Sequence, residues 1–336
     1  MKTTINIIIA TAFMAVATSA TAKSWRINNT AAAAPDFADI NEAMNSSLVT
    51  AGDTLYLDPG TSLSSSQTVK KRVTIVGPGY FRTDTPHAFA YLQSTLYIQA
   101  AGTKVEGIIM SGADIKIQAL NVTIERCKFC AIDVGYNGNA QYATIRQCYG
   151  ENVKGCSKTS NQSAYCTIEN CIISPGYTCI YDLYLPTIRH NYLRKITGNT
   201  SCFFYQLESA TITDNIIINT KYVNNIFNEV TNSVNISNNV MSGNENATFP
   251  NNIYGKTEAD IFTLTGQNDL LYQLKDGSPA KGYATDGGDC GPYGGLTPYV
   301  AGGLPNGYPY YTKAIIPAKS KNGKVNVSLK IKMQNE

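Results

Sequence analysis

Acids and amides recur just ahead of an aliphatic residue in the middle of this 336-residue chain, at Asp133, Asp182, Gln206 and Glu229. Carboxylates held at a fixed separation can act as a general acid and a general base. Arg194 and Lys195 lie between the second and third of these positions, and could neutralise a substrate carboxylate or accept a proton. We therefore take five charged residues as catalytic candidates: Asp133, Asp182, Glu229, Arg194 and Lys195.

Nine cysteines and two histidines are the remaining side chains that could bind a metal or do redox chemistry. Cys127-Lys128-Phe129-Cys130 has the spacing of a redox or metal pair, but no second pair accompanies it, so we predict structural cysteines and no metal site. A disulfide within the stretch from Cys156 to Cys202 stays open if the protein is exported. The acidic loop 286–289 could bind Ca²⁺, although a closing turn explains it better. No other cofactor is expected.

The N-terminus has the pattern of an export signal. Lys2 precedes a short apolar run, and Ala20-Thr21-Ala22 is typical of a cleavage site, so residues 1–22 are predicted to be a signal peptide cut after Ala22. No later stretch is apolar enough to span a membrane, so we expect a secreted protein, periplasmic or extracellular, without a transmembrane segment. A net charge of +3 excludes a strongly basic nucleic-acid binder. We expect a monomer.

A short unit of the form Thr-Ile-polar-polar-Cys/Asn repeats through the middle of the chain. Its isoleucines are 20 to 24 residues apart, which is the period of leucine-rich repeats and of parallel β-helices. Leucine-rich repeats need several leucines per unit, and only four leucines occur between residues 121 and 241. The units favour β-branched residues, which suit short stacked strands. The central isoleucines are Ile124, Ile145, Ile168, Ile188, Ile212 and Ile236.

Stacking turns this period into columns of equivalent residues about 4.8 Å apart. One predicted column fills a tight turn with small buried side chains that hydrogen-bond along the stack. A second column, directly after the isoleucines, alternates acid and arginine and predicts a ladder of salt bridges between neighbouring strands, formed by Glu125, Arg146, Glu169 and Arg189. The turn column consists of Cys127, Cys148, Cys171, Asn191, Asn215 and Asn239.

Both ends of the chain differ from the repeats. Residues 35–48 carry one apolar stripe, formed by Phe37, Ile40, Met44 and Leu48, which predicts a helix. At the other end, Lys321-Asn322-Gly323-Lys324 is a hairpin signal followed by an alternating strand. We therefore predict an all-β fold: a right-handed parallel β-helix of about eight to ten coils over residues 23–311, closed by a loop at 276–311 and followed by a basic hairpin at 312–336.

The sequence resembles the right-handed parallel β-helices of the pectin-lyase-like superfamily, of secreted bacterial type, over roughly residues 35–300. The resemblance rests on the predicted helix, the strand and turn at 52–60, the coils, and the closing motifs Gly277-Ser278-Pro279-Ala280 and 286–295. It implies that the helix covers the open end of the stack. It also implies that the strand carrying the acid and amide column forms a carbohydrate groove with its flanking turns.

In such a groove, Asp182 and Glu229 would lie two coils, or about 10 Å, apart, slightly beyond the range for an inverting acid and base. Arg194 and Lys195 could neutralise a uronate or abstract its C5 proton. The motifs that carry catalysis in pectate lyases and polygalacturonases are absent from this sequence. The candidate substrate-binding residues are Tyr136, Tyr177, Tyr184, Phe204 and Gln206.

Two functions follow as hypotheses. The first is a secreted carbohydrate-interacting protein, a lyase or hydrolase acting on an acidic polysaccharide. The second is a non-catalytic extracellular or cell-surface module, in which the rigid solenoid displays a binding face. The fold hosts both functions, so the fold alone does not choose between them.

Overall fold

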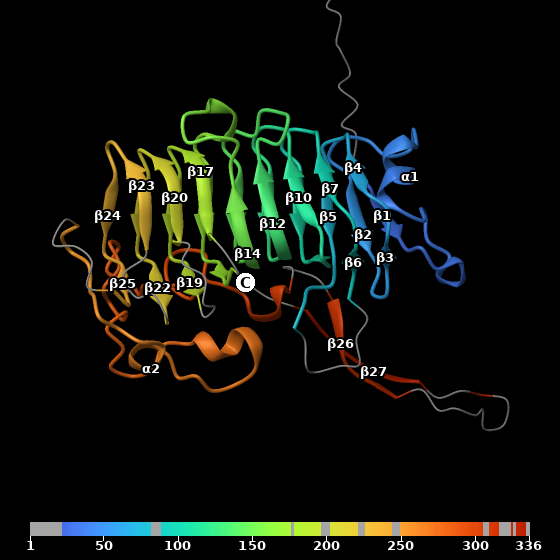
Figure 1. The fold of residues 1–336 in the computed structure, drawn as a ribbon. Helices are drawn as coiled ribbons and strands as arrows, with labels where there is room; N and C mark the ends of the chain where they lie inside the picture. The colour runs from blue at the N-terminus through green and yellow to red at the C-terminus, as the bar shows by residue number, and fades with distance from the viewer. Residues whose placement is uncertain are drawn as a thin grey trace, which may run out of the picture.

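The computed structural model describes residues 22–81, 89–175, 178–195, 202–220, 226–243, 249–304, 309–315, 324 and 327–333. The chain forms a parallel β-solenoid whose coils stack from the N-terminal to the C-terminal end, as Figure 1 shows. The predicted all-β solenoid is confirmed. The signal-peptide prediction concerns residues that lie, apart from Ala22, outside the described part of the chain.

Sheet A contains the repeated Thr-Ile segments and has ten strands in the described residues. Its isoleucines point into the core, while the residues on either side of them face outward. The strands are β1 (Ser24–Ile27), β2 (Thr54–Leu57), β5 (Thr74–Val76), β8 (Lys104–Glu106), β11 (Thr123–Glu125), β13 (Thr144–Arg146), β15 (Thr167–Glu169), β18 (Thr187–Arg189), β21 (Thr211–Thr213) and β24 (Asn235–Ser237).

Sheet B wraps the other two sides of each coil, and we divide it into two columns. Column 1 follows the tight turn after sheet A and comprises β3 (Ser62–Leu63), β6 (Tyr91–Leu92), β9 (Ile109–Met110), β16 (Ile172–Ile173), β19 (Tyr192–Lys195), β22 (Ile216–Asn219) and β25 (Val240–Met241). Column 2 completes the coil and comprises β4 (Gln67–Val69), β7 (Leu96–Ile98), β10 (Asp114–Ile117), β17 (Ile180–Tyr184), β20 (Phe204–Glu208) and β23 (Phe227–Thr231). Two longer strands run through both columns: β12 (Lys128–Val134) and β14 (Tyr149–Lys154).

The turn column forms the predicted hydrogen-bonded ladder. Each backbone N–H donates to the side chain one coil further on, through Sγ at 3.5 Å for Cys127 to Cys148 and through Oδ1 at 2.9 Å for Asn191 to Asn215. The ladder continues one step past the predicted column, to Asn252. All nine cysteines are free thiols. Burial raises the pKa of the Cys127 thiol well above its ordinary value, so this side chain stays a neutral filler.

The outer face of sheet A carries two separate pairs of the predicted salt ladder, and no ion pair between Arg146 and Glu169 joins them among the described residues. Arg146 lies 3.0 Å from Glu125, and Arg189 lies 2.7 Å from Glu169. Lys104, one coil earlier, adds a second cation at 2.9 Å from Glu125. Because these groups pair across neighbouring strands, their charges stabilise the stack and offer no free acid.

The N-terminal helix is shorter than predicted. Helix α1 spans Ile40–Asn45, with the side chain of Asp39 capping its first turn. The chain before it is held to strand β1, because Phe37 forms a bridge with Ile27. Leu48 is 57% exposed, so its place in the apolar stripe was wrong. Asn41 hydrogen-bonds to strand β4, and α1 lies at the N-terminal end of the stack (Figure 1).

Residues beyond the coils fold back along the solenoid instead of extending it. They contain helix α2 (Glu258–Ile261) and two 3₁₀ helices, η3 (Asn268–Tyr272) and η4 (Ala301–Gly303). Two further 3₁₀ helices lie earlier in the chain. Helix η1 (Ala31–Ala33) precedes α1, and η2 (Asn161–Ser163) lies in the loop before β15. Strands β26 (Pro309–Ile315) and β27 (Ser328–Met333) form the predicted antiparallel hairpin.

Candidate functional site

The outer face of column 2 carries a continuous row of polar and aromatic residues. In each of these strands an outward residue alternates with an inward aliphatic one; in β10, for example, Lys116 lies between the buried Ile115 and Ile117. Strand register joins the outward residues into one row across successive coils. The row runs Thr68, Tyr97, Lys116, Asp133, Lys154, Tyr181, Tyr205, Asn228.

A second row projects from backbone bulges. Asp182, Gln206 and Glu229 have positive φ values of 59°, 52° and 51°, and each is skipped in the pairing of its strand with its neighbours. They are the non-glycine residues with positive φ that fall inside the described strands. A bulge of this kind re-aims a side chain, at a cost of about 1–3 kcal/mol in backbone strain. Asp133 does not belong to this row, because it pairs with Lys154 and is in line with Tyr181.

The two bulge carboxyl groups have opposite environments. Glu229 Oε2 accepts hydrogen bonds from Lys158 Nζ at 3.0 Å and from Gln206 Nε2 at 3.1 Å, which lowers its pKa. Burial raises the pKa of Asp182, and the negative charge of Glu229 raises it further. Opposite shifts in neighbouring carboxyl groups are typical of an acid and base pair. Asp182 is therefore more readily protonated than an ordinary aspartate, and Glu229 is less readily protonated than an ordinary glutamate.

Asp133 is more deeply placed than either bulge acid. Its side chain is 7% exposed and lies 3.0 Å from Lys154 Nζ. Burial raises the pKa of Asp133, while Lys154 opposes the shift. Because Lys154 also faces the next coil, it brings a positive charge to Asp182 as well. Asp133 therefore fixes a cation at the edge of the site.

The other two catalytic candidates lie away from the bulge row. Arg194 is paired with Glu258 from α2, on the outside of column 1. Lys195 is fully buried, and burial lowers its pKa. Neither side chain is exposed on the column 2 face that carries Asp182.

Of the aromatic candidates, Phe204 faces the interior. It is fully buried and stacked on Phe227 at 5.3 Å, so it offers no face to a ligand. Tyr184 points outward from β17, and Tyr136 packs on Lys116, 3.8 Å from ring centre to Nζ. Tyr177 lies outside the described residues.

Sequence reasoning missed three exposed or half-buried members of the face: Tyr181, Tyr205 and Lys158. Tyr181 and Tyr205 directly precede Asp182 and Gln206, and this shared offset was a usable signal. Lys158 had no such signal. It lies in a loop 71 residues before Glu229, and only the stacking of coils brings the two together.

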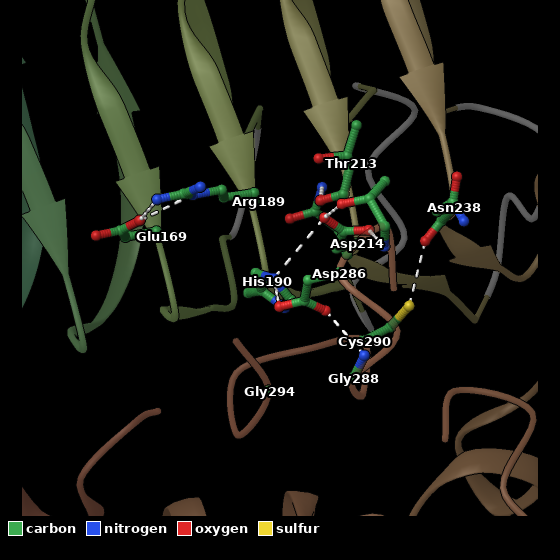
Figure 2. A network of polar contacts seen from close by, with 12 residues as sticks. Glu169, Arg189, His190, Thr213, Asp214, Asn238, Asp286, Gly288, Cys290 and Gly294 are labelled. Atoms are coloured by element: carbon green, nitrogen blue, oxygen red, sulfur yellow. Dashed lines mark hydrogen bonds and ion pairs between the residues drawn. The ribbon is translucent and has the colours of Figure 1, made fainter. Parts of the chain in front are cut away.

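A second polar cluster, shown in Figure 2, lies where the strands of sheet A end, just after β18 and β21. Its role is structural. His190 is 5% exposed, and its Nε2 lies 3.7 Å from Asp214 and 4.0 Å from Asp286. The loop containing Gly294 and Gly295 packs on the imidazole ring. Because this covers the ring, His190 is not accessible as a base.

The acidic loop that was considered for Ca²⁺ is held by its own backbone. Asp286 Oδ1 accepts from Gly288 N at 2.9 Å, and Asp289 Oδ1 accepts from Gly282 N at 3.0 Å. This is the geometry of a closing turn. Within the described residues, no group of three His, Cys, Asp or Glu side chains is placed to hold a metal ion.

No helix of the described chain is long and apolar enough to cross a bilayer.

Comparison with known proteins gives no family. No family model and no curated protein match the chain. Among solved structures, it is similar to the pectate lyase Pel9A, with 12% identity and a TM-score of 0.37 over 78% of this chain and 92% of that one. It is also similar to a mutant of the PL6-family alginate lyase AlyGC, with 13% identity and a TM-score of 0.27 over 83% of this chain and 60% of that one. Likenesses this weak leave the activity of the chain to be argued from its own site.

Proposed function

We propose that this protein binds a polysaccharide along the outer face of column 2 and hydrolyses it, with Asp182 as general acid and Glu229 as general base. The observation that carries the proposal is that both carboxyl groups project from bulges on one face, and the raised pKa of Asp182 beside the lowered pKa of Glu229 agrees with the two roles. The chain of the substrate would cross successive coils, with the half-buried rings of Tyr181 and Tyr205 available for stacking.

The spacing of the two acids is closer to that of an inverting hydrolase than to that of a retaining one. Asp182 and Glu229 lie on β17 and β23, with β20 between them, so their backbones are about 10 Å apart. The carboxyl groups would come into the inverting range of about 6.5–9.5 Å only if the two side chains lean towards each other in the complex with substrate. Asp182 would protonate the glycosidic oxygen as the bond to the anomeric carbon breaks. Glu229 would take a proton from the water that attacks that carbon from the opposite side.

An elimination reaction fits this face less well. A lyase needs a base at C5 and a cation on the uronate carboxyl group, and the two residues considered for these roles were Arg194 and Lys195. Arg194 is paired with Glu258, and Lys195 is buried. Lys154 and Lys158 could still pair with carboxylates of an acidic polysaccharide, which keeps that substrate class within the proposal.

A non-catalytic binding module is the second candidate, and one observation favours it. Glu229 is already hydrogen-bonded to Lys158 and Gln206, and Asp133 is paired with Lys154. Side chains satisfied by their neighbours can present a fixed binding surface without reacting. In this alternative the same face binds the polysaccharide and leaves it intact.

The test uses purified protein and a panel of acidic and neutral polysaccharides, with assays for new reducing ends and for the absorbance of unsaturated products. Reducing ends without unsaturated products, abolished by both D182N and E229Q, support the hydrolase. The matched control is E208Q, since Glu208 faces outward on β20 without belonging to the bulge row. Unsaturated products would indicate a lyase. Tight binding without any product would support the non-catalytic binding module. If the protein neither binds nor cleaves any polysaccharide of the panel, both candidates are overturned.

Export and the monomeric state belong to the same proposal. If residues 1–22 are a signal peptide, protein recovered from outside the cytoplasm begins at Lys23 in N-terminal sequencing. Light scattering of that protein should give the mass of one chain. A start at Met1, or the mass of a dimer, would contradict these expectations.

A further inference from the structure

One loop contacts both of the proposed catalytic acids without supplying either of them. It spans residues 155–166 between β14 and β15, and we call it the η2 loop because it contains the 3₁₀ helix η2. Its first residue, Gly155, packs on the backbone of Asp182, and Lys158 bonds to Glu229. The two acids are two coils apart, so an element that touches both can fix their relative position.

Gly155 makes room for the bulge that projects Asp182. Its backbone N–H donates to Tyr181 O at 2.9 Å, which continues the pairing of β14 with β17. A Cβ on Gly155 would overlap the carbonyl oxygen of Asp182 and lie 2.7 Å from Ser163 Oγ. Any larger residue would therefore push against the backbone of the bulge, where Asp182 has a φ of 59°. A glycine at this position is a condition for the place of the Asp182 carboxyl group.

The η2 loop is anchored at both of its ends. The carbonyl oxygen of Gln162 accepts from Ala140 N at 2.7 Å, which ties the end of the loop to the previous coil. Near its start, Cys156 N donates to the Oγ of Ser163, a fully buried serine, at 3.4 Å. Together with the bond from Gly155 to the next coil, these contacts fix the path of the loop over the end of column 2.

Lys158 brings one positive charge close to both acids. Its loop follows β14, yet its Nζ lies 3.0 Å from Oε2 of Glu229 on β23, the third strand of column 2 after β14. The hydrogen bond from Lys158 lowers the pKa of Glu229. Burial raises the pKa of Asp182, and the charges of Lys154 and Lys158 oppose that shift. Lys158 therefore favours the anionic form of each acid.

The ion pair between Lys158 and Glu229 adds little to the stability of the fold. The two side chains are 31% and 43% exposed, and exposed pairs contribute at most about 1 kcal/mol. The pair can nevertheless fix the place of a carboxylate, because Gln206 Nε2 bonds to the same oxygen at 3.1 Å. Two donors on one oxygen restrict the rotation of the Glu229 side chain.

We propose that the η2 loop positions both acids of the hydrolysis proposed above: Gly155 keeps Asp182 on its bulge, and Lys158 holds the Glu229 carboxylate in place. Both are positioning residues, because each acts on the reaction through one of the acids. The inference rests on the proposed function for its reaction. The two contacts themselves can be tested whether or not a polysaccharide is cleaved.

The test of Lys158 is K158M, with K104M as the matched control. Lys104 is 34% exposed and ion-paired, as Lys158 is, but it lies on sheet A. The carboxyl carbons of aspartate and glutamate are labelled with ¹³C and titrated by NMR, and D182N and E229Q identify the two signals. In K158M both signals should titrate at higher pH than in the unsubstituted protein, because a cation that favours both anions is removed. K104M should leave both titrations unchanged.

The test of Gly155 is G155A, with G77A as the matched control. Gly77 also packs on a carbonyl oxygen of the next coil, that of Gly107, but beside sheet A. Both variants should unfold at lower urea concentration, and only G155A should move the titration of Asp182. On a polysaccharide that the unsubstituted protein hydrolyses, G155A should lower kcat about a hundredfold with little change in KM, since a displacement of about 1 Å has an effect of that size.

Two results would overturn the proposal. The first is a Glu229 signal that titrates at the same pH in K158M as in the unsubstituted protein, and this result decides even if G155A does not fold. The second is an Asp182 signal that G155A leaves unchanged. Shifted titrations in a protein that hydrolyses no polysaccharide of the panel would support the positioning and refute only the reaction, so the two failures are distinguishable.

Discussion

Replacing Asn215 by alanine should destabilise the solenoid more than a typical polar substitution does. Asn215 is fully buried in the turn ladder. Its Oδ1 accepts from the backbone N–H of Asn191 at 2.9 Å, and its Nδ2 donates to the carbonyl oxygens of Ile188 and Thr213 at 2.9 and 2.8 Å. The variant leaves one buried N–H without its side-chain acceptor and removes the donor to two buried carbonyls.

The magnitude follows from these contacts. A buried N–H left without a partner costs about 1–3 kcal/mol, and each lost bond to a carbonyl that keeps other partners costs about 0.5–1.5 kcal/mol. We therefore expect N215A to lower the free energy of unfolding by about 2–6 kcal/mol. The matched control is N235A, because Asn235 is an exposed asparagine on β24, where the change should stay within about 0.5 kcal/mol.

The assay is urea unfolding followed by circular dichroism and by tyrosine fluorescence, whose transitions should coincide if unfolding is two-state. If N215A lies within about 0.5 kcal/mol of N235A, the ladder does not stabilise the stack by the hydrogen bonds described, and the reasoning is refuted. A change in the dependence of the free energy of unfolding on urea concentration, without a change in the midpoint of the transition, would also count against this reasoning. That slope reports the surface exposed on unfolding.

Three further predictions test other parts of the molecule. Burial opposes ionisation of Glu125, but its cations outweigh burial and lower its pKa below the ordinary 4.5, so its stabilisation is present above that pH and lost below it. E125Q should cost about 1–2 kcal/mol at pH 7 and progressively less as the pH falls below 4.5, read from unfolding curves across that pH range. A Cβ on Gly294 would overlap the carbonyl oxygen of Asp289, so G294A should expose the C-terminal segment to limited proteolysis, whereas G288A should not. Hydrolysis should fall on the alkaline side at a pH above the ordinary pKa of an aspartate, because Asp182 must stay protonated, and a rate of the unsubstituted protein that does not fall on the alkaline side would contradict this assignment.

The stacked part of the fold could be predicted from the sequence because every coil repeats the same local solution. A spacing of 20 to 24 residues places equivalent residues in contact, so the Cys and Asn ladder and the pairs from Glu125 to Arg189 follow from the period alone. The prediction of the N-terminal helix was wrong at its ends for a local reason. Phe37 pairs with β1 instead of entering a helical turn, and the apolar stripe could not reveal that bridge.

The candidate site was predicted only in part, because its geometry depends on departures from the period. Asp133 and Asp182 look equivalent in the sequence, since an aliphatic residue follows each. The bulges in β17, β20 and β23 insert one residue, which moves Asp182 and Glu229 out of the row that contains Asp133. An insertion of one residue is invisible when the loops between repeats also vary in length.

The period of the repeat cannot predict the contacts made by the non-repeating C-terminal segment. The sequence nevertheless contains a signal for them. The residue before each ladder position has positive φ, and its side chain leaves the turn towards that segment. Gln147 Nε2 donates to Pro298 O at 2.6 Å, Asn170 Nδ2 donates to Gly294 O at 2.7 Å, and Asp214 accepts from Thr285 N at 2.7 Å. Since a turn needs only a tolerated backbone conformation there, a run of six polar residues at this position indicates a partner outside the coil. The six are Arg126, Gln147, Asn170, His190, Asp214 and Asn238.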